Sequence, residues 1–295
     1  MPEANPSPVE QRIAVNGIRL AYFEWGTQHR GRRPTLLLVH ATGFHARVWD
    51  QIVRRLDGYH IVAPDQRGHG HSDKRVIGNW YEFVADLVAF VDALDLRDLI
   101  GVGHSMGAHA LIGAAAERPA RFSRIVAIDP VIAAEAVYQR NEPTPGGGAA
   151  RRKNHFDSPE QMIERLSGKG SFGRFDPATL RDYCTYGLVP NDAGGGYVLA
   201  CPPEVEASVY ATNWSNTAIY AAVRALDIPV LILRAMTPPE GGQPMQSGAS
   251  PTWPGLVHEF KHGREIYYPD RTHFIPMEIP DEVAALIRTE AERVG

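Results

Sequence analysis

Short, continuously apolar segments recur along this chain of 295 residues, and stretches with helical periodicity separate most of them. The segment 35–39, Thr-Leu-Leu-Leu-Val, is the clearest example, because it offers no polar face and a glycine-containing loop follows it. A run of this length and composition is typical of a strand that is buried on both faces. Similar runs follow at 60–63, 99–102, 124–128, 229–233 and 265–268, and helical stretches occur at 48–56, 81–94, 106–117 and 281–293. The alternation predicts an α/β domain whose mostly parallel sheet is covered by helices on both faces.

The N-terminal part of the chain departs from this alternation. Residues 12–15 and 18–25 are rich in β-branched and aromatic side chains, and the Asn16-Gly17 pair between them is a hairpin signal. We therefore expect an antiparallel pair ahead of the other strands, which brings the predicted sheet to eight strands.

The alternation is interrupted once, over residues 128–228, where no apolar strand run occurs. Amphipathic stretches with helical spacing are found there at 159–166 and 178–186. We predict a mainly helical insertion at 131–222, and a core formed by residues 1–130 and 223–295. A second irregular stretch, 236–254, is rich in proline and glycine. A loop of this length inside a compact domain is usually functional or mobile.

The composition is that of an ordinary soluble globular protein, with 44% hydrophobic and 22% charged residues. The net charge of -4 provides no basic field, which argues against nucleic acid or a membrane surface as a partner. The first ten residues contain three prolines but no apolar run, so we expect neither a signal peptide nor a membrane span. Cys184 and Cys201 lack metal-like spacing and are expected to be free thiols. These features predict a cytoplasmic protein.

The segment Gly103-His104-Ser105-Met106-Gly107 lies between an apolar run and an alanine-rich helical stretch. In this context G-x-S-x-G is the pattern of a nucleophile elbow. A sharp strand-to-helix turn holds the serine in strained backbone geometry, and the flanking glycines let neighbouring chain approach closely. The serine then projects at a helix N-terminus, where free N–H groups stabilise developing negative charge. We therefore predict that Ser105 is a nucleophile.

Three further segments accompany the elbow: 38–44 (Leu-Val-His-Ala-Thr-Gly-Phe), 64–73 (Pro-Asp-Gln-Arg-Gly-His-Gly-His-Ser-Asp) and 270–274 (Asp-Arg-Thr-His-Phe). In their order and spacing these segments resemble the α/β-hydrolase superfamily, particularly its small bacterial serine hydrolases with a helical cap, such as esterases and lactonases. The resemblance covers nearly the whole predicted core and implies the α/β-hydrolase fold. The insertion at 131–222 lies where that family carries its cap.

The resemblance also implies a general base and an oxyanion hole. The family places its histidine in the turn between the last strand and the last helix, where this chain has His273. Imidazole, with an ordinary pKa of about 6.5, can accept a hydroxyl proton and return it to a leaving group. The oxyanion hole would use the backbone N–H groups of Met106 and Thr42. Ala41 stands where the family's His-Gly-x pattern has glycine.

The acid of the expected triad is absent from its usual place. Most members of the superfamily carry it just after the strand that corresponds to 229–233. The residues that follow here, Arg-Ala-Met-Thr-Pro-Pro-Glu, contain no aspartate, and their first carboxylate is Glu240. Some branches place the acid one strand earlier, 24 residues after the nucleophile, where this chain has Asp129. Because Asp129 precedes a proline, it would also suit a plain turn. We predict Asp129 as the acid, with Glu240 as the alternative.

Aromatic and histidine side chains are candidates for the substrate pocket. These candidates are Phe44, His104, Tyr138 and Trp214. The basic stretch 151–153 could attract an acidic substrate, but a solvated surface is the favoured interpretation.

The expected reaction is hydrolysis of a small carboxylic ester or lactone through an acyl-enzyme on Ser105, with no metal or organic cofactor. Haloalkane dehalogenases and epoxide hydrolases of the superfamily use an aspartate at the nucleophile position, so the serine argues against those reactions. Three alternatives stay open. The same triad could cleave a carbon–carbon or amide bond, the protein could be a cofactor-free perhydrolase or haloperoxidase, or it could be a hydrolase-like ligand sensor.

Overall fold

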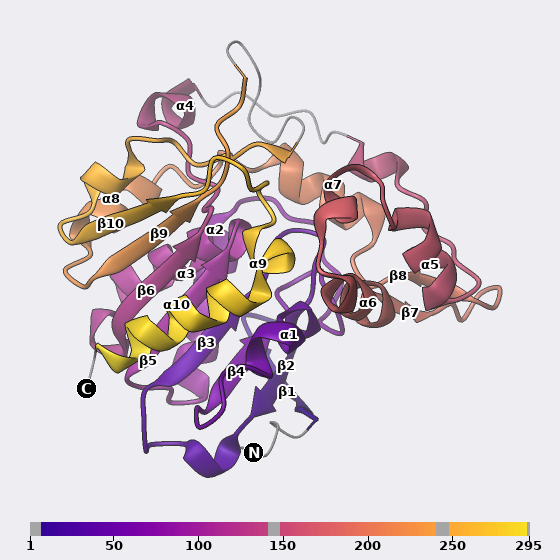
Figure 1. The fold of residues 1–295 in the computed structure, drawn as a ribbon, viewed down its shortest axis with the longest axis horizontal. Helices are drawn as coiled ribbons and strands as arrows, with labels where there is room; N and C mark the ends of the chain where they lie inside the picture. Colours follow the sequence, from indigo (N-terminus) through magenta and orange to yellow (C-terminus); the bar gives the residue numbers. More distant parts are fainter. Residues whose placement is uncertain (1–6, 141–147, 240–247, 294–295) are drawn as a thin grey trace.

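The computed structural model describes residues 7–140, 148–239 and 248–293, and an eight-stranded sheet forms its centre (Figure 1). In spatial order the strands are β1 (Val9–Val15), β2 (Ile18–Trp25), β4 (Ile61–Pro64), β3 (Thr35–Val39), β5 (Leu99–His104), β6 (Phe122–Ile128), β9 (Val230–Arg234) and β10 (Gly263–Tyr267). β2 runs antiparallel to both β1 and β4, and the other neighbouring strands pair in parallel. The predicted mostly parallel sheet with an antiparallel opening pair is therefore confirmed.

Helices cover both faces of the sheet, as predicted. One layer contains α2 (Tyr81–Ala93), α3 (Met106–Glu117) and α8 (Ile219–Ala225), and the other contains α1 (Asp50–Val53) and α10 (Pro280–Glu292). Successive side chains of β3 alternate between these layers, because a strand presents its residues to opposite faces in turn. Leu37 and Val39 join the cluster that includes α2 and α3, whereas Leu36 and Leu38 join the cluster that includes α1 and α10.

The segment predicted as one helix at 48–56 forms two short pieces instead. A 3-10 turn over Ala46–Trp49 leads into α1, which ends at Val53. Nε of Arg47 donates to the Asp50 carboxylate over 2.9 Å, and side chains three residues apart face each other in the tighter 3-10 geometry. This ion pair joins the 3-10 turn to the start of α1.

The part of the chain between β6 and β9 contains mainly helices. They are α4 (Glu135–Arg140), α5 (Pro159–Leu166), α6 (Pro177–Tyr186) and α7 (Pro203–Ala211), and a small hairpin joins β7 (Leu188–Pro190) to β8 (Tyr197–Leu199). Ser158 and Asp176 cap α5 and α6, each followed by a proline at the first helical position. In Figure 1, α5, α6, α7 and the hairpin gather on one side of the sheet, away from α4. The predicted boundary at residue 222 falls within α8, which packs on α3 in the core cluster.

The shorter elements connect these parts. The remaining α-helix is α9 (Ile275–Glu278), and 3-10 turns lie at Thr27–His29, Pro119–Arg121, Ala149–Arg151, Gly170–Arg174 and Leu256–Glu259. Within the described ranges, no helix is long and apolar enough to span a bilayer. Cys184 and Cys201 are both free and buried.

Several histidines are buried in this fold as neutral rings. His45, His69 and His109 are at most 2% exposed. Burial lowers the pKa of His45 to about 3, and lowers the pKa of His69 and of His109 to about 4. Removing an imidazolium from water is costly, so the folded protein favours the uncharged form of each ring.

The buried histidines predict that the protein loses stability in mild acid. Between their depressed folded pKa values and the unfolded value of about 6.5, the unfolded chain binds more protons than the folded protein. Their contribution is therefore complete above pH 6.5 and is lost as the pH falls towards 4. We expect the free energy of unfolding, measured with urea, to fall by at least about 2 kcal/mol between pH 7 and pH 5.

Substitutions test whether the buried histidines cause the dependence of the free energy of unfolding on pH, which is called the slope below. His69→Gln should flatten the slope, whereas His262→Gln should not, because the His262 side chain is 56% exposed. A stability that stays constant or rises from pH 7 to pH 5 would contradict this interpretation.

Candidate active site

Ser105 lies at the turn between β5 and α3, as the elbow pattern predicts. Its backbone adopts φ 59° and ψ -119°, a conformation that is strained for any residue except glycine. The N–H of Ser105 donates to the carbonyl of Ile128 over 2.9 Å, which ties the turn to the neighbouring strand β6. Because α3 begins at the next residue, the serine hydroxyl lies at a helix N-terminus.

The two glycines of the elbow allow the close packing that this turn needs. A Cβ atom on Gly107 would lie 2.3 Å from the carbonyl oxygen of Val39 at the end of β3. A Cβ atom on Gly103 would lie 2.6 Å from the Cα atom of Ala108. Both contacts are with backbone, which cannot move aside as a flexible side chain can. These positions therefore require glycine.

His273 reaches Ser105 from the loop between β10 and α9. Its Nε2 atom lies 2.9 Å from the Ser105 hydroxyl oxygen, within hydrogen-bond distance. The backbone N–H of His273 donates to the carbonyl of Gly248 over 2.7 Å. Ser105 is 3% exposed and His273 is 1% exposed, so this contact is shielded from bulk water.

Asp129 completes a continuous chain of hydrogen bonds. It follows β6 directly, adopts φ 44° and is fully buried. Its Oδ2 atom lies 2.6 Å from Nδ1 of His273. Its Oδ1 atom accepts hydrogen bonds from the Ala235 backbone N–H over 2.9 Å and from the Ser250 hydroxyl over 2.6 Å. The structure thus brings Ser105, His273 and Asp129 together. Glu240, the alternative acid, lies outside the described residues.

His104 holds the backbone of His273. Burial lowers the pKa of His104 well below its ordinary value, so its ring is neutral. Its Nε2 lies 2.8 Å from the carbonyl oxygen of His273. Because a carbonyl can only accept, Nε2 carries the proton and donates it to that bond. The residue before the nucleophile therefore fixes the loop that carries His273.

The side chains of Thr42 and Met106 are in contact, and Met106 directly follows Ser105. The Thr42 hydroxyl donates to the Met106 sulfur over 3.4 Å, which joins the loop after β3 to the start of α3. Met106 is the first residue of that helix, where a backbone N–H has no partner within the helix. The oxyanion hole at the backbone N–H groups of Thr42 and Met106 stays a prediction.

The candidate pocket residues fall into two clusters. The ring of Phe44 lies edge-on to that of His104, with centroids 6.3 Å apart, and 4.7 Å from the ring of Tyr183 in α6. Phe172, Phe175 and Phe274 extend this aromatic group. Tyr138 and Trp214 pack against each other at 5.7 Å, and Tyr138 also packs edge-on against Tyr220 of α8.

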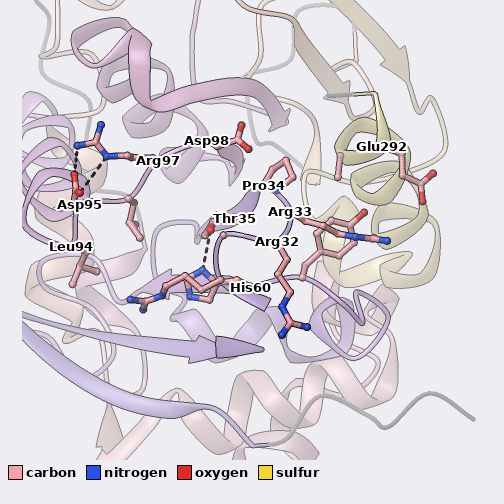
Figure 2. A pocket seen from close by; sticks show the side chains of 15 residues that line it. Arg32, Arg33, Pro34, Thr35, His60, Leu94, Asp95, Arg97, Asp98 and Glu292 are labelled. Carbon is pink, nitrogen blue, oxygen red and sulfur yellow. Dashed lines mark hydrogen bonds and ion pairs between the residues drawn. The ribbon is translucent and has the colours of Figure 1, made fainter. Parts of the chain in front are cut away.

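The pocket drawn in Figure 2 lies elsewhere. It has a volume of about 650 Å³, and four arginines line it together with Asp95, Asp98 and Glu292. Thr35 begins β3, His60 directly precedes β4, and Asp98 directly precedes β5, so this pocket borders the amino ends of the parallel strands. Ser105 follows the carboxyl end of β5. The pocket therefore lies at the amino ends of the parallel strands, whereas Ser105, His273 and Asp129 lie at their carboxyl ends.

No sequence pattern singles out the groups that surround Asp129 and His273. Gly248, Ser250 and Ala235 each hydrogen-bond to one of them, and all three come from β9 or the stretch after it. The only available signal was the length of the irregular stretch 236–254, which indicated a functional loop without naming a residue. Phe274 and Tyr183 were likewise not singled out as neighbours of Phe44.

Comparison with known proteins agrees with this architecture. The model of the alpha/beta hydrolase family matches residues 36–286. The (E)-2-((N-methylformamido)methylene)succinate hydrolase of Acinetobacter baylyi is 25% identical over 284 residues, which cover 93% of this chain and 95% of that protein. Lipase LipV of Mycobacterium tuberculosis is 25% identical over 261 residues, covering 86% of this chain and 92% of the lipase.

A solved structure shares the fold over nearly the whole length. The crystal structure of E-2-(acetamidomethylene)succinate hydrolase superposes with a TM-score of 0.77 at 23% identity, covering 96% of this chain and 98% of that one. The family match spans most of the chain, from β3 to the last helix. The chain therefore belongs to the alpha/beta hydrolase family and is a hydrolase.

Proposed function

We propose that this hydrolase cleaves a carboxylic ester or lactone, with Ser105 as nucleophile, His273 as general base and Asp129 as the orienting acid. The observation that carries the proposal is the buried chain of hydrogen bonds from the Asp129 carboxylate through both ring nitrogens of His273 to the Ser105 hydroxyl. A carboxylate on Nδ1 selects the tautomer whose Nε2 can accept a proton, and it stabilises the imidazolium that forms.

The reaction would proceed in two halves. Nε2 of His273 takes the hydroxyl proton while the Ser105 oxygen attacks the substrate carbonyl, and the N–H groups of Met106 and Thr42 stabilise the oxyanion. His273 then gives the proton to the departing alcohol oxygen, which leaves an acyl-enzyme. A water molecule, deprotonated by His273, attacks the acyl-enzyme, and the released Ser105 oxygen recovers the proton. An ester gives an acid and an alcohol, a lactone gives a single hydroxy acid, and water is the only other reactant.

Residues 131–222 would act as a cap over this site. Support comes from Tyr183 in α6, whose ring packs on Phe44 beside the proposed oxyanion loop. A cap in this position would provide one wall of the substrate pocket and limit the entry of water. The protein would act on a small molecule as a monofunctional hydrolase without a cofactor.

Removing the nucleophile tests the proposal. The purified protein should hydrolyse at least one member of a panel of p-nitrophenyl esters and lactones, and Ser105→Ala should lower kcat by about 10⁴-fold or more. Circular dichroism should show the same fold for both proteins. Full activity in Ser105→Ala would contradict the proposal, and so would the absence of turnover on every substrate, which would favour a sensor.

The identity of the acid has its own test. Asp129→Asn should lower kcat by about 10²- to 10⁴-fold, because an amide cannot hold the required tautomer of His273 or stabilise its cation. The expected change in KM is small, since Asp129 does not touch the substrate. Glu240→Gln serves as the comparison. If Glu240→Gln lowers kcat and Asp129→Asn does not, the assignment is wrong.

An amide that carries carboxylate groups is the second candidate substrate, and Arg152 favours it. Of the basic stretch, Arg151 and Lys153 are exposed, but the Arg152 side chain is only 26% exposed. One Nη atom of Arg152 lies 3.3 Å from the position of a Cβ on Gly43, which follows Thr42. Its guanidinium also bonds to Glu206 and to the Tyr183 hydroxyl. A cation at this place could bind a substrate carboxylate, and the names of two similar proteins describe amidomethylene succinates.

Arg152→Gln tests this preference for anionic substrates. We expect KM for p-nitrophenyl hemisuccinate to rise about 10-fold, as for the loss of a charge-assisted hydrogen bond, and KM for neutral p-nitrophenyl butyrate to change less than about 2-fold. Arg151→Gln, at the exposed neighbour, is the control and should alter neither value. The double variant Arg152→Gln/Glu206→Gln removes the carboxylate that would otherwise be left unpaired. Equal changes for both esters would rule out a carboxylate site at Arg152.

A further inference from the structure

The Asp129 carboxylate is held at both oxygens, and only one of them faces His273. The other oxygen, Oδ1, accepts from the Ala235 N–H at 2.9 Å and from the Ser250 hydroxyl at 2.6 Å. The Thr252 hydroxyl lies 3.3 Å from the same oxygen. Ser250 and Thr252 are 3% and 4% exposed, so these groups meet in a part of the protein that excludes bulk water.

The hydrogen of the Ser250 hydroxyl can be assigned from its partners. The backbone N–H of Thr252 donates to the Ser250 oxygen over 3.0 Å, and an ionised carboxylate can only accept. The Ser250 proton therefore points to Asp129. The single proton of the Thr252 hydroxyl has a closer acceptor, the Pro130 carbonyl at 2.7 Å. Ser250 is thus the main side-chain donor to Oδ1.

The segment 248–252, which contains Ser250, also contacts His273. The carbonyl of Gly248, two residues before Ser250, accepts the backbone N–H of His273 over 2.7 Å. Gly248 has φ 80°, and a Cβ there would lie 2.9 Å from Cβ of Thr272. The segment 248–252 therefore contacts both partners of the acid–base pair. It belongs to the irregular stretch after β9, which lacks an aspartate.

We propose that Ser250 is a positioning residue for the reaction, acting through Asp129. Its hydroxyl fixes the rotation of the buried carboxylate so that Oδ2 stays aligned with Nδ1 of His273. Most members of the superfamily carry the acid after the strand that corresponds to β9. Here the stretch after β9 would instead supply hydrogen-bond donors that orient Asp129, which follows β6. The inference rests on the proposed function of Asp129 and His273, and Ser250 itself touches no substrate.

Ser250→Ala and Thr252→Val form the test pair. Ser250→Ala should lower kcat on an active ester by about 10- to 100-fold, as expected for loss of a hydrogen bond to a charged group, with KM within about 2-fold of the wild type. Thr252→Val should change kcat by less than about 3-fold, since its proton binds Pro130 instead. Proton NMR of the wild type should show a low-field resonance from the bond between His273 and Asp129. Ser250→Ala should shift that resonance upfield or broaden it.

Ser72→Ala is the matched control. Ser72 is 2% exposed and, like Ser250, accepts one backbone N–H, that of Ala21, while its hydroxyl donates to an oxygen, the Asp65 carbonyl. Removing it should lower stability but leave kcat and the low-field resonance unchanged. Equal losses of kcat in Ser72→Ala and Ser250→Ala, or an unchanged kcat and resonance in Ser250→Ala, would overturn the positioning role. A wild type without ester turnover and without the resonance would instead overturn the proposed function on which it rests.

Discussion

The register between β5 and β6 determines where the groups of the site lie. His104 at the end of β5 pairs with Ile128 at the end of β6, so the next residues, Ser105 and Asp129, leave neighbouring strands at the same edge. His273 arrives at that edge from the loop after β10. Parallel strands all end on one side of a sheet, and the sites of such folds lie at that side for this reason. A shift of one residue in this register would turn Asp129 to the other face.

Burial of the Asp129 carboxylate imposes a second requirement. A carboxylate without exposure needs several donors, because an unpaired charge in the interior costs several kcal/mol. Asp129 has the His273 ring, the Ala235 N–H and the Ser250 hydroxyl. Asp65 meets the same requirement differently, with the backbone N–H groups of Ala46 and His71, and burial still raises its pKa. The loop after β9 thus contributes the Ala235 N–H and the Ser250 hydroxyl to the surroundings of Asp129.

Much of the fold followed from local patterns. The boundaries of α3 and α5 match the predicted 106–117 and 159–166, because glycines, alanines and a capping serine act within a few residues. The hairpin of β7 and β8 was not predicted, since strands of three residues are too short to show an alternation. The motif predicts Ser105 as nucleophile and a family spacing predicts Asp129 as acid, and the structure places both side chains within hydrogen-bond distance of His273.

The missing parts of the site depend on contacts between distant residues. Ser250 lies 121 residues from Asp129, and no local pattern distinguishes its hydroxyl from that of any loop serine. Arg152 belongs to a basic run that is typical of a surface, yet its packing turns it towards Gly43. The neighbours of Ser250 and Arg152 depend on the path that the loops take across the ends of the strands. The spacing of residues in the sequence does not determine that path.

The most direct measurement for the whole account is the site of covalent modification by a fluorophosphonate. We propose that the hydrogen bonds from Asp129 through His273 activate the Ser105 hydroxyl. Mass spectrometry of the digested protein should then place the phosphonate on the peptide that contains Ser105. Modification at another residue, or none over hours at neutral pH, would contradict the claim that Asp129 and His273 activate Ser105.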